Sequence, residues 1–598
     1  MLNINKFHIS LKLIIFIYLI LIGIFFIFLP PPFSKSDEST HFYRSISVSR
    51  GQLFCKENMV SGYFSIPSGL AKLTSTFNLP IYNEYSAKFP WKLIISTNNP
   101  ITEGADVRFY EWCSLSFIPY IPNAIGVFFS YPFNNAIVAF YFGRISGFIF
   151  FLGIFWLSLR IAPKQFHNLL LFFVSIPMVL YQVTIYSYDV MHISLILLIF
   201  SLFTSAWSQE KVKFSQYVIF CLSILIFITT KPGYYLFLLL IFLYPQKRIR
   251  IHVMKKSTFT IGIVGIFLTY SIMLIRGYGQ YSLASFINPS IQSNIIFSDI
   301  FRFIQVLIHT HILYHTEYIR GFIAAFDFSG IYVYQGVYLI VASIGAIVIY
   351  ELLQDKRLEK EYVGFGYFRT LILLGILIGT YVLVFIAMYT IYSPMGYDRV
   401  IGVQGRYFHT LFLFFIFFIV AVRVMLRKEY FKYLCITLTG IVVISLLVFT
   451  FYSRYYNYSE TFENDRELET RLNKEVSLGY VENHKEIESG IVLKMSVKKG
   501  EKIGAIQMAA VPKSKSVTIP YVFRIKSADC SRLLRYDYFD QAEIQSRRIL
   551  TQKFSPLKVT EDNLCVEIAP FSNKKSESQV SIIYLNKNPA VELLYIRN

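Results

Sequence analysis

Apolar residues in this chain occur in long runs that are separated by short polar segments. The first run, 11–31, has about the ~20 residues that a helix needs to cross a bilayer, and prolines end it. Ten more runs follow, at 134–160, 167–185, 188–207, 214–230, 233–245, 258–275, 335–352, 366–391, 407–424 and 432–452. The pattern predicts a mostly α polytopic membrane protein with about eleven transmembrane helices, the first of them a retained anchor.

The pattern changes after residue 452. Short alternating apolar runs, such as 490–497, 516–523 and 578–585, are separated by Lys, Ser, Asn and Gly, which is typical of an antiparallel β-sandwich. We therefore expect a transmembrane domain, 1–452, followed by a β-rich domain, 453–598. A role of this domain in glycan binding and a plain structural role both remain open.

Lys and Arg cluster in every second loop, which indicates the cytoplasmic side of the membrane. These residues are Lys6, Lys12, Arg160, Lys164, Lys211, Lys213, Lys247, Arg248, Arg250, Lys255, Lys256, Lys356, Arg357, Lys360, Arg423, Arg427, Lys428 and Lys432. The loops 32–133 and 276–334 and the tail would then be external. The net charge of +20 then reflects the orientation of the chain in the membrane and its attraction to anionic lipid. It does not indicate nucleic-acid binding.

Composition and cysteine placement agree with this arrangement. Hydrophobic residues make up 55% of the chain, and the mean hydropathy is +0.49. Cys55 and Cys113 lie in the first external loop, and Cys530 and Cys565 lie in the tail. An oxidising exterior favours one disulfide within each of these pairs, although four free thiols are the alternative.

The segment that follows the first apolar run carries the residues best suited to acid–base chemistry. Asp37 and Glu38 are adjacent carboxylates, and His41 would share a helix face with Asp37. Each carboxylate raises the pKa of its neighbour, and the acid with the raised pKa is the better proton acceptor. Asp37 is the first candidate for a base and Glu38 the second. Alternatively, the acids cap a helix over 38–50, and Arg44 reaches the interface as an ordinary surface residue.

Two cations at the external ends of predicted spans are candidates for binding phosphate. Arg406 offers a planar fork of donors and Lys231 offers a point charge. Asp189, in a predicted external turn, could bind an acceptor, help to hold a divalent ion or pair with Arg406. Alternatively, Asp189 forms a purely structural ion pair, and Lys231 and Arg406 are ordinary interfacial residues at helix ends. His309, His311 and His315 are spaced so that they could reach one metal from a helix, but no acidic residue or cysteine stands beside them at a recognised zinc-site spacing. We therefore favour amphipathic interfacial helices in 276–334.

Several motifs together resemble the bacterial membrane family called domain of unknown function 2142. They are Pro31-Pro-Phe-x3-Asp37-Glu38-x2-His41-Phe-x-Arg44, Phe117-Ile-Pro-Tyr120-Ile-Pro-Asn-Ala-Ile-Gly126, Pro177-Met-Val-Leu-Tyr-Gln182 with Ser187-Tyr-Asp189, Lys231-Pro-x-Tyr234, Gly321-x5-Asp327 and Gly402-Val-Gln404-Gly405-Arg406-Tyr407-Phe408. The family in turn is similar to GT-C glycosyltransferases. The resemblance implies an inverting transfer from a polyprenyl-phosphate sugar, with an acidic residue of the first external loop as base. It adds Tyr120, Asp327, Gln404 and Tyr407 to Arg44, Asp189, Lys231 and Arg406 as substrate-binding candidates.

We therefore expect a glycosyltransferase of the bacterial inner membrane, with a cytoplasmic N-terminus and an extracytoplasmic tail. Its partners would be the lipid-linked sugar, a glycan acceptor and the bilayer. Nucleotide-binding motifs are absent from the sequence, and a divalent cation, Mg²⁺ or Mn²⁺, is the one cofactor left open. The alternatives are a lipid-linked glycan flippase and a non-catalytic glycan-assembly protein.

Overall fold

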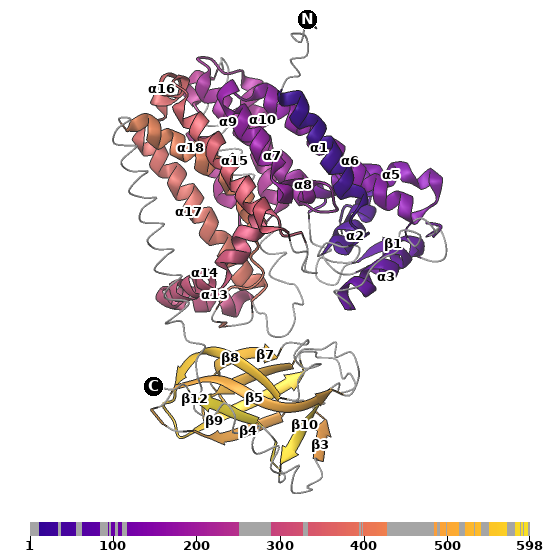
Figure 1. Cartoon of the computed structure of the whole chain (residues 1–598), viewed down its shortest axis with the longest axis vertical. Coiled ribbons are helices and arrows are strands. Elements are labelled where there is room, and N and C mark those ends of the chain that lie inside the picture. Colours follow the sequence, from indigo (N-terminus) through magenta and orange to yellow (C-terminus); the bar gives the residue numbers. More distant parts are fainter. Residues whose placement is uncertain are drawn as a thin grey trace, which may run out of the picture. The chain divides into compact units, whose positions relative to one another are not determined.

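Figure 1 shows a computed structural model of the chain, coloured from indigo at the N-terminus to yellow at the C-terminus. Before the tail, the structure describes residues 11–33, 37–54, 63–83, 94, 97, 99–101, 106–109, 116–231, 233–249, 289–326, 333–393, 396–397 and 399–426. In the tail it describes residues 483–486, 491–497, 499–500, 502–512, 521–531, 533–539, 549–570, 580–585, 588–589 and 591–595.

The chain forms two compact units. The first comprises Met1–Tyr281, His311–Met388 and Gly402–Lys432, and the second comprises Ser282–Thr310, Tyr389–Ile401 and Tyr433–Asn598. Two helices, α14 (Ile300–Ile323) and α17 (Gly366–Ile391), have residues in both units. Each unit has its own elements and its own apolar core, and the two are described in turn.

The first unit is mainly helical. Besides parts of α14 and α17, its α-helices are α1 (Leu11–Phe28), α2 (Glu38–Ser49), α3 (Ser68–Asn83), α5 (Ile121–Ser130), α6 (Ala136–Ile161), α7 (His167–Ser175), α8 (Pro177–Val183), α9 (Asp189–Ser208), α10 (Phe214–Thr230), α11 (Leu240–Leu243), α15 (Gln335–Gln354), α16 (Arg357–Tyr362) and α18 (His409–Met425). Its 3₁₀ turns are η1 (Ile118–Tyr120), η2 (Tyr131–Phe133), η3 (Lys164–Phe166), η4 (Tyr235–Leu239), η5 (Gln246–Arg248), η6 (Val363–Phe365) and η7 (Gly405–Phe408). Strands β1 (Phe64–Ile66) and β2 (Val107–Phe109) pair antiparallel.

Five helical segments among the described residues are long and apolar enough to cross a membrane. They are α6, α9, α15, α17 and the continuous stretch Gly405–Met425. Two bent pairs raise this number to at most seven: Lys164–Ser175 with Pro177–Val183, bent by 72°, and Pro289–Ser298 with Ile300–Ile323, bent by 106°. The described residues thus support a multi-span membrane protein with five to seven candidate spans, where the sequence pattern predicts about eleven.

The difference in span number has three sources. The predicted spans 258–275 and 432–452 lie outside the described residues. The predicted spans 11–31 and 214–230 are helical, but α10 has only 17 residues and the apolar helix described within α1 covers Phe16–Phe28. The run 233–245 folds as the 3₁₀ turn η4 and the single turn α11. Apolar runs of this length are also compatible with short elements inside a bundle.

Contacts in the first unit bring several basic loops together at one end of the bundle. The Trp207 indole donates to the carbonyl of Leu243 at 3.2 Å, and Arg248 donates to the carbonyl of Trp207 at 2.5 Å. Val212 forms a β-bridge with Ile249, and Tyr362 donates to the carbonyl of Thr204 at 3.0 Å. The segments near residues 207, 248 and 362 therefore meet, and the opposite end of α9 begins at Asp189.

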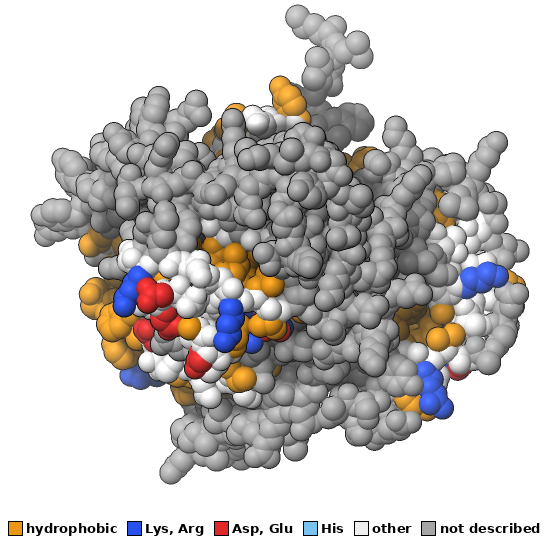
Figure 2. Space-filling view, turned by 90° about the horizontal axis from the view of Figure 1, so that it is seen from below, with side chains coloured by type: hydrophobic (Ala, Val, Ile, Leu, Met, Phe, Trp, Pro, Cys, Tyr) orange, Lys and Arg blue, Asp and Glu red, His pale blue; other side chains and the backbone are white. Residues whose placement is uncertain are grey.

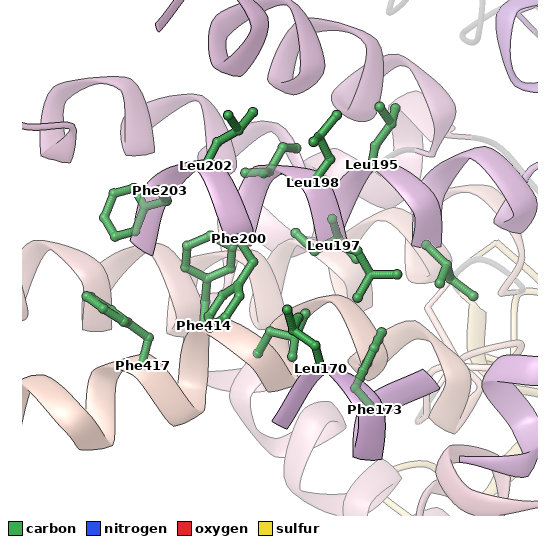
Figure 3. Packing of buried hydrophobic residues seen from close by; sticks show 14 of the residues in the cluster. Leu170, Phe173, Leu195, Leu197, Leu198, Phe200, Leu202, Phe203, Phe414 and Phe417 are labelled. Atoms are coloured by element: carbon green, nitrogen blue, oxygen red, sulfur yellow. The ribbon is translucent and has the colours of Figure 1, made fainter. Parts of the chain in front are cut away.

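The core of the first unit surrounds α9, which is buried along its whole length. This helix packs against α6, α8, α10 and α18. Figure 3 shows Phe200 and Phe203 of α9 against Phe414 and Phe417 of α18, with side chains of α7 beside them. Because α9 has no face toward lipid, polar side chains on it need partners within the bundle.

The second unit includes the tail, which forms two antiparallel sheets. One has the order β11-β10-β5-β12, with β3 paired to β10 and β8 paired to β5, and the other has the order β4-β9-β6-β7. The strands are β3 (Asn483–Glu486), β4 (Ile491–Ser496), β5 (Lys502–Pro512), β6 (Tyr521–Lys526), β7 (Leu533–Phe539), β8 (Ile549–Lys558), β9 (Asn563–Pro570), β10 (Val580–Leu585), β11 (Asn588–Pro589) and β12 (Val591–Tyr595). Ile506, Met508, Phe523 and Val566 share one buried core, so the two sheets contribute to it together.

A disulfide joins Cys530 to Cys565 in the tail, as predicted from the cysteine pattern. The predicted partner pair Cys55 and Cys113 lies outside the described residues. Nearby on the second sheet, Glu567 pairs with Arg524 at 2.6 Å and with Lys526 at 2.7 Å. Acidic and basic side chains also stand side by side in the described part of the face drawn in Figure 2. A disulfide in this region is consistent with an extracytoplasmic location.

Candidate functional site

Asp37 occupies the residue before α2 and is exposed. Its φ of 62° is in the left-handed region, which Asp tolerates better than most residues. Its backbone carbonyl accepts a hydrogen bond from the amide of His41 at 3.0 Å, but its side chain makes no capping hydrogen bond to the helix. The Asp37 carboxylate is therefore presented to solvent instead of satisfying the end of α2.

Glu38 has the opposite environment. Its carboxylate is fully buried and forms a two-point ion pair with Arg144 of α6, with Nε to Oε1 at 2.9 Å and Nη2 to Oε2 at 2.7 Å. The amide of Tyr186 donates to the same Oε1 at 3.2 Å. Both oxygens of Glu38 are thus engaged with protein donors.

His41 lies on α2 one turn beyond Asp37 and is buried. Its Nδ1 is 2.9 Å from the hydroxyl of Tyr120 in η1, and its ring meets the ring of Tyr188 edge to face at 5.0 Å. Pro119 and Pro122 flank Tyr120 at the junction of η1 and α5, and their fixed φ favours the start of a helical turn. The α2 segment, η1 and the turn before α9 therefore meet at one place.

Lys231 and Asp189 form a second buried ion pair. The Nζ of Lys231, just after α10, donates to Oδ1 of Asp189, at the start of α9, over 3.1 Å. The same Nζ lies 3.9 Å from the centre of the Tyr407 ring and 5.0 Å from that of Tyr188. Two aromatic faces and a carboxylate thus surround this ammonium group, which stabilises its charge away from water.

Arg406 lies in η7, close to this pair. Its Nη1 donates to Oε1 of Gln182 in α8 at 3.3 Å, and Asp37 and Asp189 are near enough for their charges to act on it. Within the part of the chain that the structure describes, its buried Nε has no hydrogen-bond partner. Arg406 therefore keeps a donor that an anionic ligand could use.

Close backbone packing fixes the segment that carries Arg406. An added Cβ at Gly405 would lie 1.9 Å from the carbonyl oxygen of Tyr318 in α14, and Gly321 faces the backbone of Gly405 in the same contact. Side chains at these two positions would separate α14 from η7. Tyr234 adds a hydrogen bond from its hydroxyl to the carbonyl of Tyr407 at 2.7 Å.

The structure brings together Asp37, His41, Tyr120, Asp189, Lys231, Arg406 and Tyr407, with Gln404 as the residue before η7. Arg44 makes other contacts, because it donates to the carbonyls of Leu53 and Gln52 at 2.8 and 3.3 Å and lies over the Phe64 ring. Asp327 lies outside the described residues. No cluster of three or more His, Cys, Asp or Glu side chains suited to a metal occurs among those described.

Three polar residues of this region were not chosen from the sequence. Arg144 and His192 lie inside predicted spans, where an ionisable side chain is itself a signal of a polar network. His192 connects three helices, because its Nδ1 is 2.6 Å from Thr230 Oγ1 and its Nε2 is 2.8 Å from Thr410 Oγ1. Tyr188 stands directly before Asp189 but gives no sequence signal of its own.

The comparisons with known proteins give one match. The family described as predicted membrane protein, with domain of unknown function 2142, matches residues 19–415. No curated protein and no solved structure matches the chain. The match includes every residue gathered around Asp37 and Arg406, and it ends before the tail.

Proposed function

The chain belongs to the predicted membrane protein family with domain of unknown function 2142, and on this premise we propose that it is a GT-C-like membrane glycosyltransferase. It would transfer a sugar from a polyprenyl-phosphate donor to an envelope polysaccharide or a lipid-linked glycan, with inversion at the anomeric carbon. The observation that carries the proposal is Arg406, a half-buried arginine whose Nε has no hydrogen-bond partner among the described residues and which lies within electrostatic reach of the exposed Asp37 carboxylate.

In this reaction Asp37 is the base. The acceptor hydroxyl gives its proton to the Asp37 carboxylate while its oxygen forms a bond to the anomeric carbon. The bond from that carbon to the phosphate oxygen breaks, and the phosphate leaves with the electron pair. In the same step Asp37 loses its negative charge and the phosphate gains one. The positive charges of Arg406 and Lys231 then stabilise the leaving phosphate, because the Asp37 carboxylate no longer neutralises them.

The phosphate would bind at Arg406 and Lys231. Arg406 offers the unused Nε, and the Lys231 ammonium is held by Asp189 beneath the ring of Tyr407. A guanidinium and an ammonium fixed before the reaction stabilise developing phosphate charge without rearrangement of the site. Tyr120, Tyr188 and His41 supply the aromatic faces and polar edges that a sugar ring contacts.

The proposed orientation places this site on the external side of the bacterial inner membrane. The basic loops that meet near Trp207 and Arg248 would be cytoplasmic, and the disulfide in the tail supports an oxidising compartment for residues 453–598. Sugars on lipid carriers are the donors available there. The tail would form an extracytoplasmic β-sandwich, and Mg²⁺ or Mn²⁺ remains a prediction as a cofactor.

One observation is also what the second candidate, a flippase for a lipid-linked glycan, requires. An apolar groove of about 600 Å³ lies between α1, α7 and α15, with Tyr18, Phe172, Ser175, Pro177, Val341 and Ile344 among its lining residues. It follows α15 from Val337 to Glu351, which is about 21 Å at 1.5 Å per residue. A hydrocarbon chain fits such a groove in either function. The two differ in whether a glycosidic bond is made.

The test is complementation of a deletion strain, with mass analysis of the surface glycans. Asp37→Asn keeps the size of the side chain and its tolerance for the left-handed conformation, so the protein level should be unchanged while glycan modification falls about 10² to 10⁴ fold. Asp106→Asn is the matched control, because Asp106 is an exposed acid that, among the described residues, forms a surface ion pair with Arg50. Full modification with Asp37→Asn would refute the assignment. A changed sidedness of the lipid-linked sugar with every glycosidic bond intact would support the flippase.

A further inference from the structure

The ion pair between Glu38 and Arg144 lies directly behind the exposed Asp37. Both side chains have 0% exposure, and the pair is bidentate. Arg144 also donates from Nη1 to the carbonyl of Ile27 at 2.8 Å and to that of Pro30 at 3.3 Å. One guanidinium on α6 therefore holds both the end of α1 and the start of α2.

The pair also reaches the turn before α9. Glu38 Oε1 accepts the amide of Tyr186, and the Tyr186 hydroxyl lies 2.9 Å from the carbonyl oxygen of Phe140 on α6. Gly143 makes room for this hydroxyl, since a Cβ there would lie 1.8 Å from it. Tyr188 and Asp189 follow two and three residues later, so their place depends on the same contacts.

We infer that Glu38 and Arg144 are positioning residues that set the place of Asp37 relative to the Tyr188–Asp189 turn and to Arg406. The inference rests on the proposed function, because it assigns the pair a part in the same site. The Asp37 side chain makes no capping bond, so the position of its carboxylate depends on the backbone, which the His41 amide and the adjacent Glu38 hold. A carboxylate held in this way acts on the acceptor hydroxyl from a constant direction.

Physical chemistry separates this role from a purely stabilising one. Removing one member of a buried ion pair leaves an uncompensated charge and destabilises a protein strongly, whereas replacing both members with apolar residues of similar volume is often neutral or stabilising. Positioning behaves differently, because a displacement of about 1 Å at a reacting group lowers a rate about 10² fold. Stability should thus recover in a double apolar variant, and activity should not.

The first experiment compares Glu38→Leu, Arg144→Met and the double variant in the full-length protein. We expect each single variant to unfold at a lower temperature in detergent, the double variant to unfold at a higher temperature than either, and glycan modification to fall about 10² fold in all three. Glu359→Leu with Arg423→Met, which removes an ion pair whose Glu359 side chain is 57% exposed, should leave glycan modification unchanged. Wild-type modification by the double variant would overturn the inference.

The second experiment measures position without any substrate. The native cysteines that carry free thiols are first replaced. Spin labels at Ser39, beside Asp37, and at Thr229, beside the Lys231 segment, then report the distance between α2 and α10. We expect a narrow distance distribution in the parent protein and a clearly broader one in the double apolar variant. Equal widths would overturn the inference. If the parent protein transfers no sugar but the widths differ, the proposed function fails and the positioning role stands.

Discussion

The ion pair between Lys231 and Asp189 gives the sharpest prediction about energetics. The two groups are 3.1 Å apart and each is only 6% exposed. At that distance, with an effective dielectric constant of about 20, their attraction is about 5 kcal/mol. Removing one partner of a buried pair costs about 3 to 5 kcal/mol, since the remaining charge stays buried. We therefore expect Asp189→Leu and Lys231→Met each to destabilise the protein by about 3 kcal/mol.

The double variant, Asp189→Leu with Lys231→Met, should be less destabilised than the two single variants added together, with a coupling energy above about 1 kcal/mol. The assay is unfolding of the four proteins in the same detergent, followed by circular dichroism and by the accessibility of the buried thiol of Cys221. Additive effects of the two single variants would refute the reasoning, because they would mean that the two charges do not interact.

Three other changes test further parts of the molecule. Gly143→Ala puts a methyl group against the Tyr186 hydroxyl, so it should lower the unfolding temperature in detergent. Gly153→Ala, in the same helix, meets open space and should not lower that temperature, since Ala has the higher helix propensity. Cys530→Ser opens a disulfide with a sequence separation of 35, so the tail of the full-length protein should lose about 2 to 4 kcal/mol and be cleaved faster by protease; an equal cleavage rate contradicts this. Burial raises the pKa of Glu567, but the charges and hydrogen bonds of Lys526 and Arg524 outweigh burial, so the pKa lies below its ordinary value of 4.5. The stability that the ionised Glu567 contributes is present above the unfolded pKa and is lost as pH falls through the folded pKa. Protease resistance of the tail should therefore decline below about pH 4.5, and Glu567→Gln should flatten that decline.

Much of the helical architecture was predictable, because long apolar runs have few alternatives in a membrane protein. The exceptions have local causes. The run 167–185 breaks at Pro177, where the two helices meet at 72°, and a proline inside a helical pattern is a readable signal for such a break. The run 233–245 is too short for a regular span and folds partly as 3₁₀ helix. Hydropathy alone does not distinguish a lipid-facing span from α9, which is buried throughout.

For the candidate site, the sequence identified residue types but not their partners. The sequence ranked Asp37 before Glu38 as a base, but it did not indicate that Asp37 is exposed and that Glu38 is buried against Arg144, 106 residues away. Such a pairing depends on how α6 packs against α2, which a local pattern does not contain. Asp189 pairs with Lys231, whereas the sequence suggested Arg406 as its possible ion-pair partner. Tyr188 shows the same limit, since its contacts arise only from the folded turn.

Arg144 has a consequence for how a newly made chain enters the bilayer. A lone arginine in the middle of a helix opposes insertion by about 2.5 to 3.5 kcal/mol on translocon scales, and the only ion-pair partner described for it is made 106 residues earlier. We therefore expect the segment around Glu38 to stay near the insertion machinery until α6 arrives. Biogenesis of the protein would then contain a checkpoint, at which membrane proteases remove chains that fail to join these two charges.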